Sequence, residues 1–288
     1  MSEADLDAFV AGYVVPVEAE REEDAAPSAY RFVDVGGIRV RYARQGDVGP
    51  TVLLLHGFGG DLDTWLFNLE ALGEQSTVVA LDLPGHGQSD RTLPGRTLGE
   101  LGRFVVRFLD AVEIERAHLV GHSLGGAIAA QMVLDRPDRV ESLALIASAG
   151  LGDEIDTAYT EGFAAAQSRR ELKPLVERLF ARPELVTRQL LDAILKYKRL
   201  DGVSELLGEL GGSLFAQGRQ REQPGRRLGE TGKRILVVWG ADDRIIPAQH
   251  ARQAPPSATV RIIEGAGHMV QMEKAGEVNV LLRRHLLG

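Results

Sequence analysis

Residues 121–125, Gly-His-Ser-Leu-Gly, form a Gly-x-Ser-x-Gly motif. The motif follows an apolar segment at 117–120 and precedes a helical pattern at 126–134, so it occupies a sharp turn between a strand and a helix. This is the context of a nucleophile elbow, in which Ser123 is exposed beside the first amides of the helix. Those amides carry positive partial charge, which suits a developing oxyanion. Because Gly and Ser are common residues, the motif alone is also compatible with a Gly-rich loop.

A serine hydroxyl is a weak nucleophile at neutral pH, so it needs a histidine that takes its proton and a carboxylate that orients the histidine. Asp242 and Asp243 follow the apolar strand pattern at 235–239, and His268 lies in a Gly-rich loop after the next strand pattern. The order Ser, acid, His is the one expected of such an elbow. The alternatives, a surface-loop histidine and a solvated Asp-Asp turn, do not explain why all three groups follow apolar strands. The sequence therefore predicts an acyl-transfer site with Ser123, His268 and one of the two aspartates.

Strand and helix patterns alternate along most of the chain, which predicts an α/β fold with a mostly parallel central sheet flanked by helices. A hairpin is expected at 30–43. The segments that follow it read as buried strands (51–55, 77–82, 117–120, 140–146, 235–239, 259–263) and as helices (62–72, 97–112, 126–134, 249–253, 269–287). Ligands of such sheets bind beyond the carboxyl ends of the strands, where the serine, aspartate and histidine loops fall.

Two parts of the chain depart from this alternation. Residues 151–231 contain four helical patterns, at 163–170, 172–180, 183–197 and 203–214, and we expect them to form a helical cap. The cap would be inserted between the two parts of the core, 30–150 and 232–288. Residues 1–29 read as a flexible acidic tail or linker, because residues 1–30 hold eight acidic residues and one arginine.

The composition excludes several classes of function. The chain has no cysteine, which rules out disulfides and thiolate metal sites and fits a cytoplasmic protein. A net charge of −8 disfavours nucleic acid as a partner. No apolar run approaches the roughly 20 residues of a membrane span, and no signal peptide is recognisable. The histidine spacing gives no metal motif, and no dinucleotide or phosphate-binding loop is present, so we expect neither metal nor cofactor.

Taken together, these motifs resemble the α/β-hydrolase superfamily. In that family the acid commonly precedes a variable residue, two aliphatic residues and a proline, which matches residues 243–247 and implies Asp243 rather than Asp242. The His-Gly motif at 56–59 resembles the family's oxyanion loop, which implies that the amides of Phe58 and Leu124 hold the oxyanion. His56 is then a loop-packing residue rather than a base.

The resemblance narrows to the hydrolase-like domain of the acetoin dehydrogenase complex acyltransferase (dihydrolipoamide acetyltransferase) component. It is carried by residues 51–69, 148–152, 168–174, 195–202 and 267–273. It implies a small acyl substrate such as an acetyl-lipoamide-like thioester, and other subunits of a 2-oxoacid or acetoin dehydrogenase complex as partners. Residues 4–15 resemble the end of the lipoyl domain that precedes this domain. The sequence contains no lipoyl-lysine hairpin, so it is either truncated or a shortened relative.

Alternatives remain open for the reaction. A Ser-His-Asp site passes an acyl group to water or to a thiol, depending on which acceptor enters. The other interpretations are a stand-alone carboxylesterase or carbon–carbon bond hydrolase of the same fold, and a non-catalytic assembly module. Candidate substrate-binding residues are Trp65, Phe163 and Tyr197, together with Lys196 and Lys198, for which ordinary packing or solvated charge is the alternative.

Overall fold

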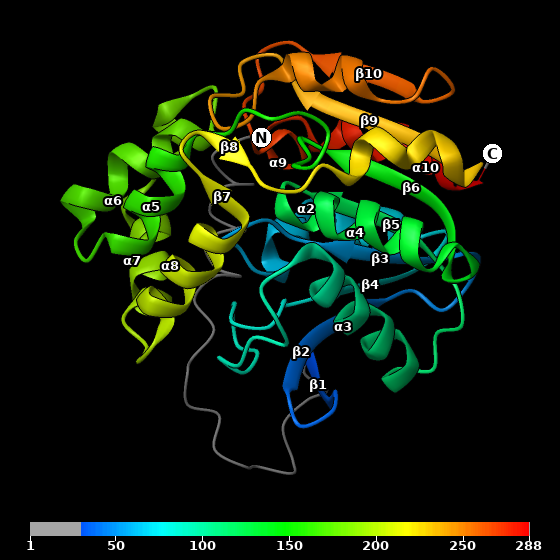
Figure 1. The fold of residues 1–288 in the computed structure, drawn as a ribbon, viewed down its shortest axis with the longest axis horizontal. Helices are drawn as coiled ribbons and strands as arrows, with labels where there is room; N and C mark the ends of the chain where they lie inside the picture. The colour runs from blue at the N-terminus through cyan, green and yellow to red at the C-terminus, as the bar shows by residue number, and fades with distance from the viewer. Residues whose placement is uncertain (1–29, 288) are drawn as a thin grey trace.

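An eight-stranded sheet, in the order β1-β2-β4-β3-β5-β6-β9-β10, runs through the computed structural model, which describes residues 30–287 (Figure 1). Its strands are β1 (Tyr30–Asp34), β2 (Arg39–Gln45), β3 (Thr51–Leu55), β4 (Thr77–Leu81), β5 (Ala117–His122), β6 (Val140–Ile146), β9 (Arg234–Gly240) and β10 (Thr259–Ile263). Strand β2 pairs antiparallel with β1 and with β4, and the other neighbours pair in parallel. The predicted α/β fold with a mostly parallel sheet is confirmed. The predicted acidic tail at 1–29 lies outside the described residues.

Helices cover both faces of the sheet (Figure 1), so the central strands read as continuous apolar runs. On one face, α4 (Leu124–Asp135) packs against α3 (Leu98–Ala111) and the 3₁₀ segment η5 (Pro224–Thr231). On the other face, α10 (Ala275–Leu287) packs against α2 (Leu66–Gly73) and α9 (Val270–Glu273). A capping box fixes the start of α3, because the Thr97 hydroxyl and the Glu100 carboxylate each bind the other residue's backbone amide.

Four helices group at one side of the sheet in Figure 1: α5 (Thr157–Ala165), α6 (Arg169–Val176), α7 (Arg188–Lys198) and α8 (Val203–Leu214). The short elements η3 (Glu177–Leu179) and η4 (Pro183–Leu185) lie between α6 and α7, and an antiparallel pair of short strands, β7 (Phe215–Ala216) and β8 (Arg219–Gln220), follows α8. We call residues 151–231 the cap region. The prediction for 203–214 is confirmed, and that for 163–170 is wrong. The first helix ends at Ala165 and a new one begins after Ser168, whose hydroxyl accepts from the Glu171 amide.

Several other predicted helices are interrupted. The segment at 183–197 divides into η4 and α7, because Thr187 caps a new helix start. The segment at 62–72 divides into η1 (Leu62–Trp65) and α2. The closing segment at 269–287 divides into α9 and α10, with the break at Lys274. The remaining short elements are η2 (Pro137–Arg139) and η6 (Ala248–Gln253).

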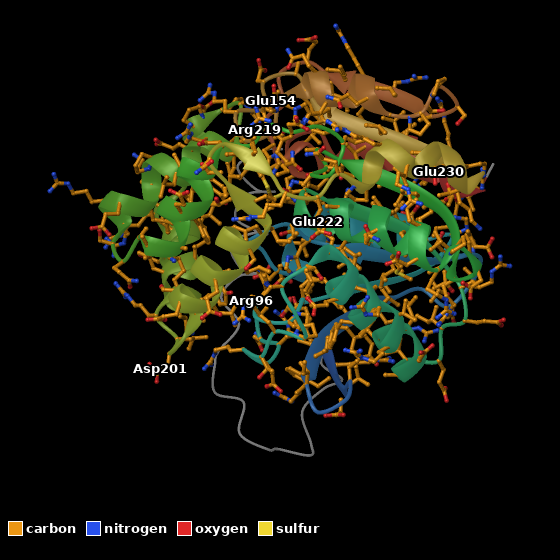
Figure 2. All side chains as sticks on the ribbon, viewed as in Figure 1. Arg96, Glu154, Asp201, Arg219, Glu222 and Glu230 are labelled. Carbon is orange, nitrogen blue, oxygen red and sulfur yellow. The ribbon has the colours of Figure 1, made fainter. Side chains whose placement is uncertain are left out.

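The cap region is fastened to the core through backbone hydrogen bonds. The amide of Asp156 donates to the carbonyl of Ile245 (2.9 Å), and the amide of Met269 donates to the carbonyl of Leu179 (3.1 Å). Glu154, labelled in Figure 2, also lies 2.7 Å from the Nε2 atom of His250 in the core through its Oε2 atom. These contacts hold the cap region over the ends of the parallel strands.

A second set of contacts joins the end of the cap region to α3. The carboxylate of Glu222 accepts from the Leu98 amide (2.9 Å) at the helix start. Arg96, which precedes that helix, forms an ion pair with Glu209 of α8. Figure 2 labels Arg96 and Glu222, which lie on the side of the core that faces α8.

Candidate functional site

Ser123 stands between β5 and α4 in a strained backbone conformation, with φ +52° and ψ −118°. A non-glycine residue in this region costs of order 1–3 kcal/mol and persists only where its surroundings fix it. Here the Ser123 amide donates to the carbonyl of Ile146 (3.1 Å), and the Ser123 carbonyl accepts from the amides of Ala127 (3.2 Å) and Ala149 (3.0 Å). The predicted turn between strand and helix is therefore present and is held from three sides.

The glycines of the motif allow the backbones to approach at this turn. A Cβ atom on Gly121 would lie 2.4 Å from the carbonyl oxygen of Gly125. A Cβ atom on Gly125 would lie 2.3 Å from the carbonyl oxygen of Leu55. No real side chain tolerates such distances, so each position requires glycine for β3, β5 and α4 to meet.

A narrow cavity of about 60 Å³ lies between the strand ends and the cap region, and both Ser123 and His268 line it. Its other walls are mostly apolar and include no Asp, Glu, Lys or Arg. They comprise Gly57, Phe58, Gly59, Gly60, Thr64, His122, Ile155, Tyr159, Thr160, Phe163, Val176, Leu179, Phe180, Leu190, Ile194, Phe215, Ile245, Met269 and Met272. The Ser123 hydroxyl has no hydrogen-bond partner within residues 30–287. It is therefore free to meet a molecule in this cavity.

His268 is bound on one side by a carboxylate. Its Nδ1 atom lies 2.8 Å from Oδ2 of Asp243, and both side chains are buried. A carboxylate only accepts, so Nδ1 carries the proton, and Nε2 is the ring nitrogen without a partner in the described part of the chain. Asp242 is exposed and forms no hydrogen bond through its side chain with any described residue. The structure thus brings Asp243 to His268 but contains no hydrogen bond between Ser123 and His268 among the described residues.

Four donors converge on the Asp243 carboxylate. Besides His268, the indole Nε1 of Trp239 donates to Oδ2 (3.0 Å), and the amides of Ile245 (2.8 Å) and Ile246 (3.0 Å) donate to Oδ1. Only an ionised carboxylate accepts all four bonds. The turn at 243–246 therefore holds a negatively charged carboxylate against the Nδ1 atom of His268.

Two backbone amides beside the serine have no acceptor in residues 30–287: those of Phe58 and Leu124. Leu124 is the first residue of α4, where helix amides lack an internal partner. The Phe58 loop is held by His56, whose Nδ1 donates to the Gly57 carbonyl (2.8 Å) and whose Nε2 accepts from the Leu83 amide (2.9 Å). Burial lowers the pKa of His56 to about 4, so this imidazole is neutral and committed to the loop.

Below this loop lies a buried charge cluster that the sequence analysis did not identify. The Arg41 guanidinium contacts Asp63 (3.2 Å) and Asp82 (3.3 Å), and all three side chains are almost completely buried. Asp82 also accepts from the amides of Leu62 (2.8 Å) and Gln88 (2.8 Å). The cluster ties η1 to β2 and to the loop after β4.

His122, inside the motif, lies beside His268. Its Nε2 is 3.0 Å from the His268 carbonyl, and the ring centres are 4.8 Å apart. Since a carbonyl only accepts, Nε2 must donate; burial lowers the pKa of His122 well below its usual value and favours this neutral form. The Gly-x-Ser-x-Gly motif does not predict this hydrogen bond between His122 and His268.

Of the predicted substrate-binding residues, only Phe163 lines the cavity. A Cβ atom on Gly59 would lie 2.4 Å from its Cε1 atom, so the ring packs directly on the loop at 56–59. Trp65 is fully buried, edge-on to His122, and is not part of the cavity wall. Tyr197 lies outside it as well, because its hydroxyl donates to the Gly85 carbonyl (2.7 Å).

The two cap lysines have different environments. Lys196 is exposed, whereas the Lys198 ammonium donates to the Ala164 carbonyl (3.0 Å) and lies over the Phe163 ring. Burial lowers the pKa of Lys198 to about 8. Neither lysine lines the cavity.

Within residues 30–287 there is no group of three or more His, Cys, Asp or Glu side chains that is able to hold a metal ion. The same residues contain no helix whose length and apolar character would let it cross a membrane.

Comparison with known proteins assigns the family. The family described as alpha/beta hydrolase fold matches residues 50–275. The chain is 60% identical, over all of its length and 77% of the relative's, to the "Dihydrolipoyllysine-residue acetyltransferase component of acetoin cleaving system" of Cupriavidus necator. It is 31% identical to the "2-hydroxy-6-oxononadienedioate/2-hydroxy-6-oxononatrienedioate hydrolase" of Paraburkholderia phymatum, over 90% of this chain and 95% of the relative.

A solved structure gives the same fold. A meta-cleavage product hydrolase from Pseudomonas fluorescens superposes with a TM-score of 0.79 at 24% identity, over 88% of this chain and 96% of that one. The turn at Ser123, the sheet, the family match, the sequence relatives and the solved structure agree. The chain belongs to the alpha/beta hydrolase fold family, and within it to the relatives of the acetoin-cleaving acetyltransferase component.

Proposed function

We propose that this protein is an acyl-transfer enzyme that uses Ser123, His268 and Asp243 on a small thioester or ester, such as an acetyl-lipoamide-like substrate. One observation carries the proposal: His268 lines the same small cavity as Ser123 while Asp243 binds its Nδ1 atom at 2.8 Å. This leaves Nε2 as the nitrogen that is able to take the serine proton.

In the proposed reaction, the Ser123 oxygen attacks the acyl carbonyl while its proton passes to Nε2 of His268. The resulting oxyanion accepts hydrogen bonds from the Phe58 and Leu124 amides, which have no other acceptor in the described residues. The intermediate then expels the thiol, which receives the proton from His268 and leaves an acyl-Ser123 ester. An acceptor gives its proton to His268, attacks this ester and restores the serine.

The cavity supports a short, neutral acyl group. Its volume is about 60 Å³ and its walls are mostly apolar. The Paraburkholderia relative is named for a dicarboxylate substrate, and binding such a dianion normally requires cationic side chains. None lines this cavity, which favours acyl transfer over carbon–carbon bond hydrolysis.

The 60% identical relative is named as a component of an acetoin cleaving system. By this similarity, we propose other subunits of an acetoin or 2-oxoacid dehydrogenase complex as partners, a second thiol or water as the acyl acceptor, and a cytoplasmic location. The cap region, 151–231, then covers the acyl site of the core formed by 30–150 and 232–288.

The test is labelling with a fluorophosphonate together with turnover of an acetyl thioester. We expect the wild-type protein to be labelled at Ser123 and to turn over acetyl thioesters. Ser123→Ala should lose both the labelling and the turnover. A dienone acid should be a poor substrate. Wild-type protein that resists the phosphonate would instead support a non-catalytic assembly module, and turnover by Ser123→Ala would contradict the mechanism.

A further inference from the structure

Glu273, the last residue of α9, is a buried carboxylate that forms no ion pair with any described residue. It is 3% exposed. Its Oε2 atom accepts from the Gly267 amide (2.6 Å), and the Ala181 amide donates to Oε1 (3.0 Å) and more weakly to Oε2 (3.3 Å). The carboxylate therefore binds two separate backbone segments.

Burial of a carboxylate without a cation is costly, and burial raises the pKa of Glu273. The backbone amides of Gly267, Ala181 and Arg182, together with the charge of Arg182, oppose this shift because they stabilise the ionised form. An apolar residue at this position would avoid the desolvation cost but would leave the Gly267 and Ala181 amides without an acceptor. The position of those two amides therefore indicates what the carboxylate does.

One amide belongs to the loop that carries His268, and the other belongs to the cap region. Gly267 immediately precedes His268, and Met269, which follows it, donates its amide to the Leu179 carbonyl (3.1 Å). A Cβ atom on Gly267 would lie 2.7 Å from the Ala181 nitrogen. The segment 179–181 thus lies directly against the histidine loop, and His268 sits between two fixed neighbours.

The same cap segment also forms part of the acyl site. Leu179 and Phe180 line the cavity together with Ser123 and His268. A displacement of segment 179–181 would therefore change both the cavity wall and the support of the histidine loop.

We propose that Glu273 is a positioning residue that joins the His268 loop to cap segment 179–181, so that His268 is held in place only when the cap is seated. The proposal rests on the proposed function for the role of His268. It assigns Glu273 no contact with substrate and no proton transfer.

Glu273→Gln tests this link between the His268 loop and cap segment 179–181, with Glu277→Gln as the matched control. Glutamine keeps one acceptor oxygen and presents an NH₂ group, which cannot accept from an amide, to the other segment. Glu277 lies one turn further along and is exposed. We expect Glu273→Gln to lower kcat for acetyl thioester turnover about 10- to 100-fold with KM unchanged, since a small misplacement of a reacting group has an effect of this size. Glu277→Gln should match the wild type.

A spectroscopic readout separates positioning from a general loss of stability. The proton between His268 and Asp243 should give a low-field NMR resonance in the wild type and in Glu277→Gln, and this resonance should shift or broaden in Glu273→Gln. A Glu273→Gln protein with unchanged kcat and an unchanged resonance, even if it melts at a lower temperature, would overturn the proposal. If that variant does not fold, Glu273→Asp, which keeps the charge but is too short to reach both amides, provides the same comparison.

The outcomes also distinguish this inference from the proposed function. A wild-type protein without phosphonate labelling or turnover contradicts the proposed function. The NMR resonance of the His268 proton still tests whether Glu273 links the His268 loop to segment 179–181. A labelled, active wild type with an equally active Glu273→Gln variant contradicts only the inference.

Discussion

The imidazole of His122 lies 4.8 Å from that of His268, centre to centre, and its Nε2 atom is 3.0 Å from the His268 carbonyl oxygen. The residue next to the predicted nucleophile therefore holds the backbone of the predicted base. It acts from the side of the elbow, whereas Glu273 contacts the same loop next to the cap region.

His122→Phe keeps an aromatic ring but removes this donor and leaves a buried carbonyl unsatisfied. We expect the free energy of unfolding to fall by about 1–3 kcal/mol, measured by urea denaturation. We also expect kcat to fall, because the His268 backbone loses a support. His250→Phe, at a buried histidine paired with Glu154 away from the cavity, should retain turnover. Unchanged stability and turnover in His122→Phe would show that the contact has no consequence.

Asp243→Asn and Asp242→Asn separate the two adjacent aspartates. All four donors around Asp243 need an acceptor, and in either orientation the NH₂ group of an asparagine would face two of them. We expect kcat to fall by about 10⁴, as for the corresponding change in a serine protease triad, with a loss of about 1–3 kcal/mol of stability. Asp242 is exposed, so Asp242→Asn should keep wild-type kcat. The reverse ranking would move the acid to Asp242.

Phe163→Leu should widen the cavity, because the Phe163 ring lines it and packs on Gly59 in the predicted oxyanion loop. The measurement is kcat/KM for a series of acyl thioesters of increasing chain length. One methylene group in an apolar pocket is worth about 1–3 kcal/mol, so the ratio of butyryl to acetyl should rise roughly tenfold or more. Tyr197→Phe is the control: its hydroxyl binds the Gly85 carbonyl outside the cavity, and its loss should leave the ratio unchanged.

His86→Gln should flatten the pH dependence of stability. Burial lowers the pKa of His86 to about 3, and its Nδ1 atom contacts the Pro84 carbonyl (3.1 Å). The unfolded chain binds a proton below about pH 6.5 while the folded state does not, so this histidine makes stability fall as pH decreases from 6.5 towards 3.

In His86→Gln, we expect the free energy of unfolding to change less steeply with pH in that window, by up to about 1.4 kcal/mol per pH unit. Urea denaturation between pH 6.5 and 4.5 measures this difference. The buried carboxylates around Arg41, whose pKa values are raised by burial, act in the opposite sense. They are the same in both proteins and cancel in the difference. Parallel stability curves for the two proteins would contradict a neutral, buried His86.

The sequence predicted most of the sheet, because strands buried on both faces read as unbroken apolar runs. It also predicted the turn at Ser123, since glycines at 121 and 125 are required by the close approach of β3, β5 and α4. These features depend on local pattern and backbone sterics, which a sequence displays directly.

Side-chain environments were harder to predict, because they depend on which face of each helix packs inward. Trp65 was expected at the substrate but is directed inward by η1. Lys198 reads as a solvated charge, yet it is buried against the end of α5. Glu273 lies in a stretch that carried the family resemblance, but its partner at Ala181 is 92 residues away, and no local pattern indicates such a contact.

The two backbone hydrogen bonds that fasten the cap region have a practical consequence for protein engineering. Asp156 binds Ile245, two residues from Asp243, and Leu179 binds Met269, next to His268. Exchanging this cap for that of another hydrolase would replace the supports of the predicted acid and the predicted base along with the pocket wall. A chimera that aims to change only the substrate range should therefore retain residue 156 and the segment 179–181 and exchange the helices between and beyond them.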